Sequence, residues 1–177
     1  MRLVRRLGKL VLVIIVLLFC FVLFRIGCTP AKQARIVRAP IEHAGLDASN
    51  RCDLARDEAH GGHTLQRHVG KSDAELRERL ENESISADST YSDRATAEMA
   101  AAAAIRENNR RIDSWLHRPG GHSNLVLDYD SDKPLGRSMR LSDAHSFPCS
   151  HAVVVLKWVN PQTYYVLTSY PECWKPQ

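Results

Sequence analysis

Three histidines lie within one short stretch of the sequence, which reads DEAHGGHTLQRHVGKS and spans residues 57–72. Histidine can act as a general acid or base near neutral pH, and it can also bind a metal ion. The same stretch contains the letters of a helicase box, DEAH, and the end of a phosphate-binding loop, GKS. The three histidines are His60, His63 and His68. The stretch could therefore serve in acid–base catalysis, metal binding or nucleotide hydrolysis.

The spacing of these motifs excludes nucleotide hydrolysis and disfavours a metal site. A phosphate-binding loop needs a glycine five positions before Gly70, where this chain has Leu65. His60 and His63 are separated by two glycines, without the carboxylate-and-histidine helix that binds zinc in metalloproteases. The five cysteines form no CxxC pair. We therefore expect no metal ion and no cofactor, which leaves a histidine acting as an acid or a base.

The first half of the chain after residue 48 has helical patterns. Ser49 or Asn50 can cap a helix that runs to about Ala59, and a second short helix carries Leu65, His68 and Val69 and ends at Gly70. The sequence Ser72-Asp73-Ala74-Glu75 is a capping box that starts a third helix. A long helix is predicted from Ser92 through an alanine run to about Leu116.

The second half has strand patterns. Alternation predicts strands near 125–129, 135–141, 151–159 and 163–170, and residues 160–162 form a turn between the last two. Helices followed by strands predict an α+β fold, in which an N-terminal helical part packs on a C-terminal antiparallel sheet. With a three-residue turn, Cys149 and Cys173 lie opposite each other across the last hairpin. In an oxidising compartment the two could form a disulfide; otherwise they are free thiols.

The N-terminus has the pattern of a signal or an anchor. Four basic residues precede an unbroken apolar run over residues 10–24, which spans about 22 Å of a ~30 Å hydrocarbon core. Three alternatives remain open: a membrane anchor through residues 7–26, a lipoprotein acylated at Cys28, and a cleaved signal. We therefore divide the chain into a signal or anchor segment (1–28), a tether (29–48) and a folded domain (49–177). An inner-membrane or periplasmic location, with export of the domain, is the expectation.

The positive charge of the chain belongs to its N-terminus. The net charge is +4, but residues 1–38 hold eight of the 24 basic residues and no acidic ones. Residues 39–177 thus have 16 basic and 20 acidic residues, a net charge of −4. This balance disfavours strong nonspecific binding to nucleic acid, although a small basic cleft is compatible with it.

Three blocks of sequence resemble one known family. They are Gly61–Leu76 with Arg79-Leu80 (GGHTLQRHVGKSDAEL), Ser89–Glu98 (STYSDRATAE) and Tyr165–Pro171 (YVLTSYP). In this order they resemble the RNase A-like toxin domain at the C-terminal ends of bacterial contact-dependent growth inhibition proteins (CdiA). The blocks span roughly residues 50–172. The resemblance implies a metal-independent ribonuclease of RNase A-like fold, used in interbacterial competition and neutralised by a cognate immunity protein.

The resemblance also implies an active site formed by His68, Arg79, Thr168 and Tyr170. Cleavage of RNA without a metal needs a base for the 2′-hydroxyl, an acid for the leaving oxygen and donors for the charge on phosphorus. His68 can be the base or the acid, Arg79 offers a planar guanidinium and Thr168 a hydroxyl donor. Thr168 and Tyr170 share one face of a strand, about 6.6 Å apart. The second proton carrier is open between Tyr170 and His63.

Each of these residues also has a structural interpretation. Arg79 can pair with Glu75 or Glu83 on its helix, Thr168 can be an ordinary strand residue and Tyr170 a core residue. Family members usually follow a large delivery protein, whereas here a short apolar segment and a tether precede the domain. The expected substrate is RNA in a target-cell cytoplasm, with tRNA as one candidate. The alternative is a non-catalytic, membrane-tethered envelope module that kept the fold.

Overall fold

The computed structural model describes residues 52–173. The chain separates into two units, residues 1–39 and 40–177, and the described residues all belong to the second. The predicted anchor (1–28), the tether (29–48) and Cys28 lie outside the described residues. Within residues 52–173, no helix has the length and apolar character needed to span a bilayer.

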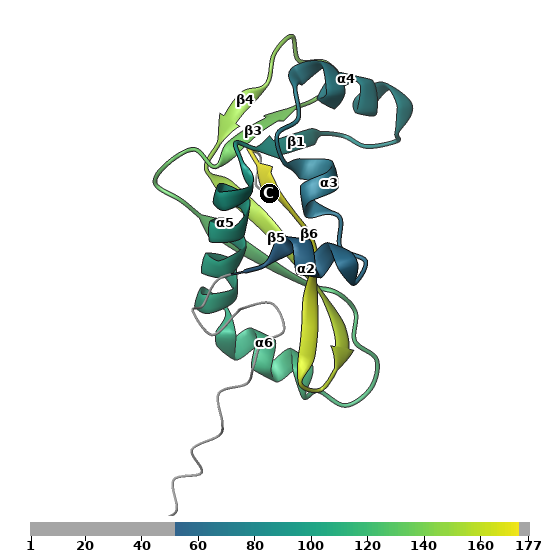
Figure 1. Ribbon diagram of the computed structural model, residues 1–177, viewed down its shortest axis with the longest axis vertical. Helices are drawn as coiled ribbons and strands as arrows, with labels where there is room; N and C mark the ends of the chain where they lie inside the picture. Colours follow the sequence, from purple (N-terminus) through teal and green to yellow (C-terminus); the bar gives the residue numbers. More distant parts are fainter. Residues whose placement is uncertain (1–51, 174–177) are drawn as a thin grey trace, which may run out of the picture. The chain divides into compact units, whose positions relative to one another are not determined.

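Three short helices open the described part of the chain (Figure 1). They are α2 (Leu54–Ala59), α3 (Thr64–His68) and α4 (Asp73–Asn82). Asp53 caps α2 by accepting the N–H of Arg56, so the prediction of Ser49 or Asn50 as its cap was wrong. The capping box of α4 is confirmed, because Ser72 and Glu75 each bond the backbone N–H of the other.

The long helix predicted up to Leu116 is broken into α5 (Arg94–Glu107) and α6 (Asn109–Leu116). Asn108 separates them with φ −103° and ψ 17°, and its side-chain amide donates to the carbonyl of Ala104 at 3.0 Å. A side chain that bonds the preceding turn competes with the helical backbone pattern. The prediction of one continuous helix was therefore wrong.

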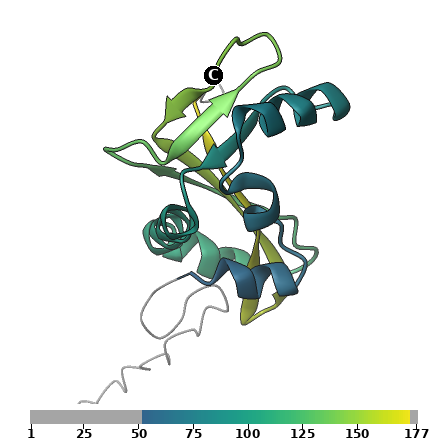
Figure 2. The same cartoon turned by 45° about the horizontal axis from the view of Figure 1, so that its top comes forward.

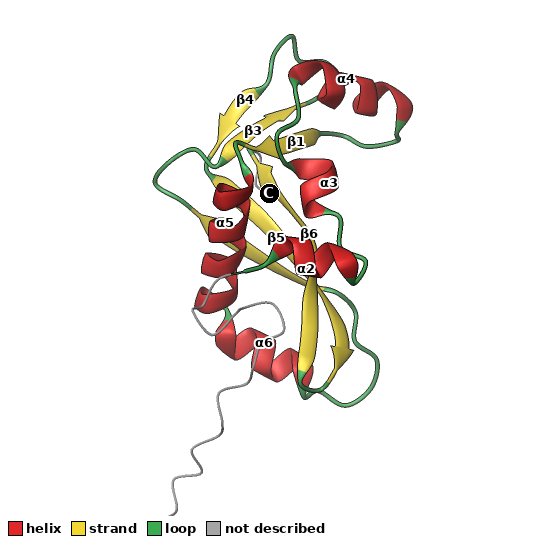
Figure 3. Cartoon of the chain, in the orientation of Figure 1, coloured by secondary structure: helices red, strands yellow, loops and turns green. Residues whose placement is uncertain are grey.

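The strands form two three-stranded antiparallel sheets (Figure 3). One has the order β2-β5-β6, with β2 (Leu125–Asp130), β5 (His151–Asn160) and β6 (Thr163–Glu172). The other has the order β1-β3-β4, with β1 (Asp88–Tyr91), β3 (Gly136–Met139) and β4 (Phe147–Cys149). The α+β class with antiparallel pairing is confirmed, but the expectation of a single sheet was wrong. The sequence patterns missed β1 and β4.

The β5-β6 hairpin is tighter and less regular than predicted. Asn160 pairs with Thr163, so the loop has two residues rather than three. The register then shifts twice along the ladder, and the second shift leaves Leu167 as an extra residue between Val166 and Thr168. Leu167 is thus the centre of a β-bulge, and it lies in the middle of the strand that carries the predicted site.

The free edge of β6 is covered by α2 and α3. The N–H of Val166 donates to the Asp57 carboxylate at 3.1 Å, and the N–H of Ser169 donates to the hydroxyl of Thr64 at 2.9 Å. The N–H of His63 donates to the carbonyl of Leu167 at 3.0 Å. These bonds satisfy an edge that would otherwise be exposed, and they fasten the histidine-bearing segment to the bulge.

The core lies between α5 and the β2-β5-β6 sheet, and Figure 2 views α5 nearly end-on beside the sheet. All five alanines of the run 100–104 are buried, which explains the run as close helix–sheet packing. Tyr91 of β1 and Tyr164 of β6 are fully buried.

Candidate active site

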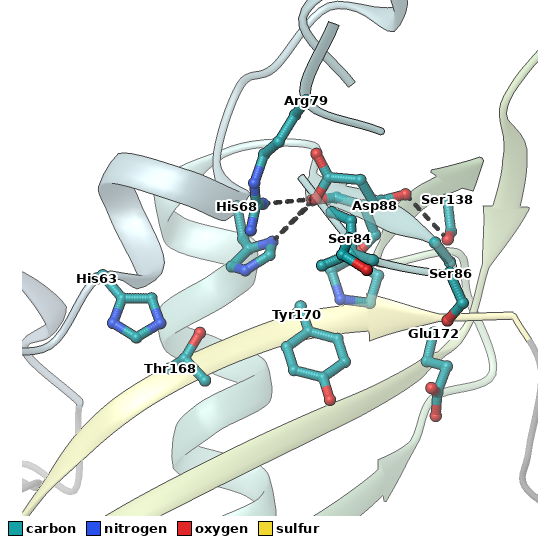
Figure 4. Close-up of a pocket in the computed structure, with 14 residues that line it drawn as sticks. His63, His68, Arg79, Ser84, Ser86, Asp88, Ser138, Thr168, Tyr170 and Glu172 are labelled. Carbon is teal, nitrogen blue, oxygen red and sulfur yellow. Dashed lines mark hydrogen bonds and ion pairs between the residues drawn. The ribbon is translucent and has the colours of Figure 1, made fainter. Parts of the chain in front are cut away.

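A cavity of about 460 Å³ lies between the two sheets and the helices α3 and α4 (Figure 4). Its walls come from α3, α4, the segment leading into β1, β1 itself, β3 and the end of β6. The structure places all five sequence-predicted catalytic residues in its lining: His63, His68, Arg79, Thr168 and Tyr170. Residues about one hundred positions apart in the chain thus share one cavity.

The bulge in β6 turns Thr168 and Tyr170 toward this cavity. Before Leu167, the buried side chains of β6 are Tyr164 and Val166; after it, they are Ser169 and Pro171. Side chains alternate between the faces of a strand, and one extra residue exchanges the two sets. Without the bulge, Thr168 and Tyr170 would continue the buried face.

The hydroxyl of Thr168 is buried and, among the described residues, has no hydrogen-bond partner. A buried hydroxyl without a partner costs free energy and is uncommon in folded proteins. Because Thr168 lines the cavity, its hydroxyl is a candidate donor to a bound molecule. A ligand oxygen that accepted a hydrogen bond from this hydroxyl would remove the free-energy cost of its missing partner.

His68 ends α3 and is 8% exposed. Its Nδ1 lies 3.0 Å from the carbonyl of Ser89. A carbonyl can only accept, so Nδ1 carries the proton and, in the neutral ring, Nε2 holds the free lone pair. Burial lowers the pKa of His68 to about 4, and the positive charge of Arg79 acts in the same direction. The ring is therefore neutral at neutral pH, and the lone pair on its Nε2 has no protein partner in the described part of the chain.

Arg79 is held between two carboxylates. Its Nη1 donates to Oδ1 of Asp88 at 2.7 Å, and its Nε lies 3.2 Å from Oε2 of Glu83. The side chain of Asp88 is 2% exposed and that of Glu83 is 42% exposed. Glu83 was an expected partner and Asp88 was not. The guanidinium thus lies within the cavity wall, where it is a candidate group for binding an anion.

Tyr170 and His63 flank His68. The rings of His68 and Tyr170 are 5.4 Å apart between centroids and inclined at 41°. Burial raises the pKa of the Tyr170 phenol, so the hydroxyl keeps its proton at neutral pH. Burial, with the charge of Arg67, lowers the pKa of His63. Figure 4 shows His63 and His68 facing Thr168 and Tyr170 across the cavity.

Comparison with known proteins shows the family to which the chain belongs. The family model described as bacterial CdiA-CT RNAse A domain matches residues 62–171. The chain belongs to this family. A similar solved structure is the crystal structure of a CdiA-CT/CdiI complex from Y. kristensenii 33638, at 33% identity and a TM-score of 0.57. The match covers 63% of this chain and 99% of the other. A search of curated proteins gives no match.

Membership of the CdiA-CT RNase A family makes this, in general terms, a nuclease toxin domain. The matched residues run from the glycine before His63 to the proline after Tyr170, so they enclose the cavity wall from α3 to β6. The cavity of this CdiA-CT RNase A domain is lined by all four residues that the resemblance implies for the active site.

Sequence reasoning missed one functional candidate, Asp88. It lies directly before the Ser89–Glu98 block, in a four-residue strand whose sequence, DSTY, shows neither alternation nor an apolar run. An acidic residue in such a segment resembles an ordinary surface residue. Four other residues of the cavity lining were also not predicted from the sequence: Ser84, Ser86, Ser138 and Glu172.

The cysteines of this CdiA-CT RNase A domain lie outside the cavity lining. Cys149 and Cys173 are joined by a disulfide with a Cα–Cα distance of 4.8 Å. The three-residue turn used to place them opposite each other was wrong. They meet because Cys149 ends β4 and Cys173 follows β6, so the bond links the two sheets. Cys52 is a buried free thiol, and residues 52–173 contain no group of three or more metal-binding side chains.

Proposed function

We propose that this domain is a metal-independent ribonuclease that cleaves RNA through attack by the 2′-hydroxyl, leaving a 2′,3′-cyclic phosphate. The observation that carries the proposal is the orientation of His68. Its Nδ1 donates to the Ser89 carbonyl, which leaves the lone pair on Nε2 free to accept a proton. The same cavity is lined by Arg79 and by Thr168, whose hydroxyl has no partner within residues 52–173.

In the first step, Nε2 of His68 removes the proton of the 2′-hydroxyl, and the resulting oxygen attacks the adjacent phosphorus. A base must be unprotonated before it acts, and burial of His68 favours that state. The hydroxyl of Thr168 and the guanidinium of Arg79 donate to the phosphate oxygens as negative charge develops there. Both donors are in place before substrate binds, which lowers the reorganisation that the step requires.

The leaving 5′-oxygen needs a proton. Tyr170 and His63 are the two candidates, since both line the cavity with His68. Tyr170 holds its proton at neutral pH but is a weak acid, whereas His63 is a stronger acid that is mostly unprotonated at that pH. We propose Tyr170 as the donor because its ring lies directly beside that of His68. Tyr170→Phe should then slow cleavage more than His63→Gln.

The experiment that tests the reaction uses the purified chain, an RNA strand and a DNA strand of the same sequence in excess chelator. The expected products are RNA fragments with 2′,3′-cyclic phosphate and 5′-hydroxyl ends, with the DNA intact. Fragments with 5′-phosphate ends, or cleavage that requires an added metal ion, would contradict the mechanism. No cleavage by wild type would favour the non-catalytic envelope module.

We further propose that the domain acts as a toxin in interbacterial competition, on RNA in a target-cell cytoplasm, and that a cognate immunity protein neutralises it. Family membership supports the toxin role, and the solved neighbour, a CdiA-CT/CdiI complex, supports a protein partner. Attachment to the membrane through residues 7–26, or through an acylated Cys28, is part of the proposal.

Growth inhibition tests the toxin role. Residues 40–177 produced in the cytoplasm should stop growth, and the His68→Ala variant should not. Equal inhibition by the two proteins would show that toxicity does not depend on the proposed chemistry. Sequencing the cleaved RNA ends from such cells would identify the RNA that is cut, with tRNA as one candidate.

A further inference from the structure

A buried carboxylate, that of Asp88, lies in the cavity wall. Asp88 is 3% exposed and is the first residue of β1. Its Oδ1 accepts from Nη1 of Arg79 at 2.7 Å and lies 3.9 Å from Nδ1 of His68. Figure 4 shows both interactions converging on the same carboxylate. One acidic side chain thus contacts two of the residues that the proposed reaction uses.

The backbone of β1 holds this carboxylate in place. Asp88 pairs with Met139 of β3, and its carbonyl accepts from the hydroxyl of Ser138 at 3.1 Å. The next residue, Ser89, provides the carbonyl that binds Nδ1 of His68. Two consecutive residues of one strand therefore set the position of Arg79 and the orientation of His68.

The two carboxylates that contact Arg79 differ in strength. The ion pair with Glu83 is exposed to solvent, and exposed pairs contribute little to fixing a side chain. The pair with Asp88 is shielded from water, where a charge-assisted hydrogen bond is strong and its loss leaves a buried charge. Asp88 is therefore the main constraint on the guanidinium.

We propose that Asp88 is a positioning residue of this active site: its carboxylate fixes the guanidinium of Arg79 at the phosphate position and places a negative charge beside His68. The assignment rests on the proposed ribonuclease function. Asp88 does not contact the substrate; it acts through Arg79 and His68.

Asp88→Asn tests this assignment, because asparagine has nearly the same shape but no charge. In the full-length chain, kcat for RNA cleavage should fall roughly 30-fold, the order expected when a group that contacts the transition state is displaced. KM should change less than kcat, because loss of the negative charge favours phosphate binding while displacement of Arg79 disfavours it. The matched control is Asp73→Asn, which removes another aspartate–arginine pair, with Arg137 at 2.9 Å, outside the cavity lining. Its kcat should stay within twofold of wild type.

A second measurement does not depend on activity. The titration of His68 can be followed by NMR in the wild type and both variants. Loss of the Asp88 charge should lower the pKa of His68 further, and Asp73→Asn should leave it unchanged. The other titratable or charged groups around His68 stay the same. They are Arg67 on α3 and His63 at its N-cap, Arg79 on α4 and Glu83 at its C-cap, and Tyr170 on β6.

The outcomes separate the two proposals. If wild type cleaves RNA and Asp88→Asn matches it in both kcat and the His68 titration, the positioning role is overturned and the ribonuclease function stands. If wild type does not cleave RNA, the ribonuclease function fails, and the NMR titration alone decides whether Asp88 acts on His68. A drop in kcat of the same size in Asp73→Asn would show a general structural effect and would also overturn the positioning role.

Discussion

His68 and His151 are equally buried, at 8% exposure each, but their surroundings differ. His151 has a carboxylate at each ring nitrogen: Oδ1 of Asp130 lies 2.9 Å from Nδ1, and Oδ1 of Asp128 lies 3.4 Å from Nε2. His68 has a carbonyl at Nδ1, and its Nε2 has no protein partner in the described part of the chain. The nearby cations, including Arg79, disfavour its protonation. Burial alone therefore does not distinguish the proposed base from His151; His68 differs in lining a cavity with an Nε2 that has no protein partner within residues 52–173.

The largest expected effect comes from replacing each histidine in turn. His68→Ala should reduce RNA cleavage by about 10³-fold or more, because it removes the proposed base. His151→Ala should keep activity within about threefold and lower the free energy of unfolding by about 1 kcal/mol. Cleavage rates and denaturant unfolding curves for the two variants measure this. A comparable loss of activity in both would erase the distinction between the two histidines.

Loss of the disulfide that links the sheets should, like loss of His151, lower stability more than it lowers activity. Replacing both Cys149 and Cys173 by serine opens a cross-link with a sequence separation of 24 residues. The free energy of unfolding should fall by about 3 kcal/mol, while cleavage by the folded protein should change only a few-fold. Urea unfolding and cleavage assays below the transition test this. A loss of activity larger than about tenfold would show that the bond also shapes the cavity.

Removal of a single hydroxyl separates function from stability at two threonines, Thr168 and Thr64. Thr168→Val removes a hydroxyl that has no protein partner within residues 52–173, so cleavage should fall about 30-fold to 100-fold while stability stays the same or rises. Thr64→Val is the control, because the Thr64 hydroxyl accepts the N–H of Ser169. Its loss should lower the free energy of unfolding by roughly 1–3 kcal/mol. If Thr168→Val retains full activity, Thr168 is not a phosphate donor.

The smallest effect is on the pH dependence of stability. The native pKa of His68, about 4, lies below its ordinary 6.5. As pH falls through this window, the unfolded chain binds a proton that native His68 does not, so stability falls. Asp57 has the opposite effect, because burial raises its pKa from 3.8 to about 7 and its contribution is lost as pH rises. From about pH 7 to about pH 4.5, His68→Gln should gain roughly 2 kcal/mol relative to wild type, and Asp57→Asn should lose stability relative to it.

Denaturant unfolding at the two pH values measures both shifts. Parallel changes in wild type and His68→Gln would mean that the native pKa of His68 lies near its ordinary 6.5, and that burial does not disfavour protonation of this ring.

The sequence by itself determined the features that depend on neighbours in the chain. The capping box of α4 needs residues 72–75, and the β5-β6 hairpin needs two alternating segments and a short turn, so both could be predicted. The candidate residues His68, Arg79, Thr168 and Tyr170 were also named from the sequence, through the family resemblance. Asn108 was missed, since an asparagine breaks a helix only in some contexts.

The tertiary structure alone decided how those residues meet. β1 is too short and polar to be recognised, and it exists because Asp88 and its neighbours pair with β3 some fifty residues later. The bulge at Leu167 turns Thr168 and Tyr170 away from the core, and it depends on the ladder with β5 and on the bond from His63. The contact between Asp88 and Arg79 requires both β1 and α4 to be in place. Long-range pairing sets these positions, and it leaves no local signal in the sequence because each partner is supplied by a distant segment.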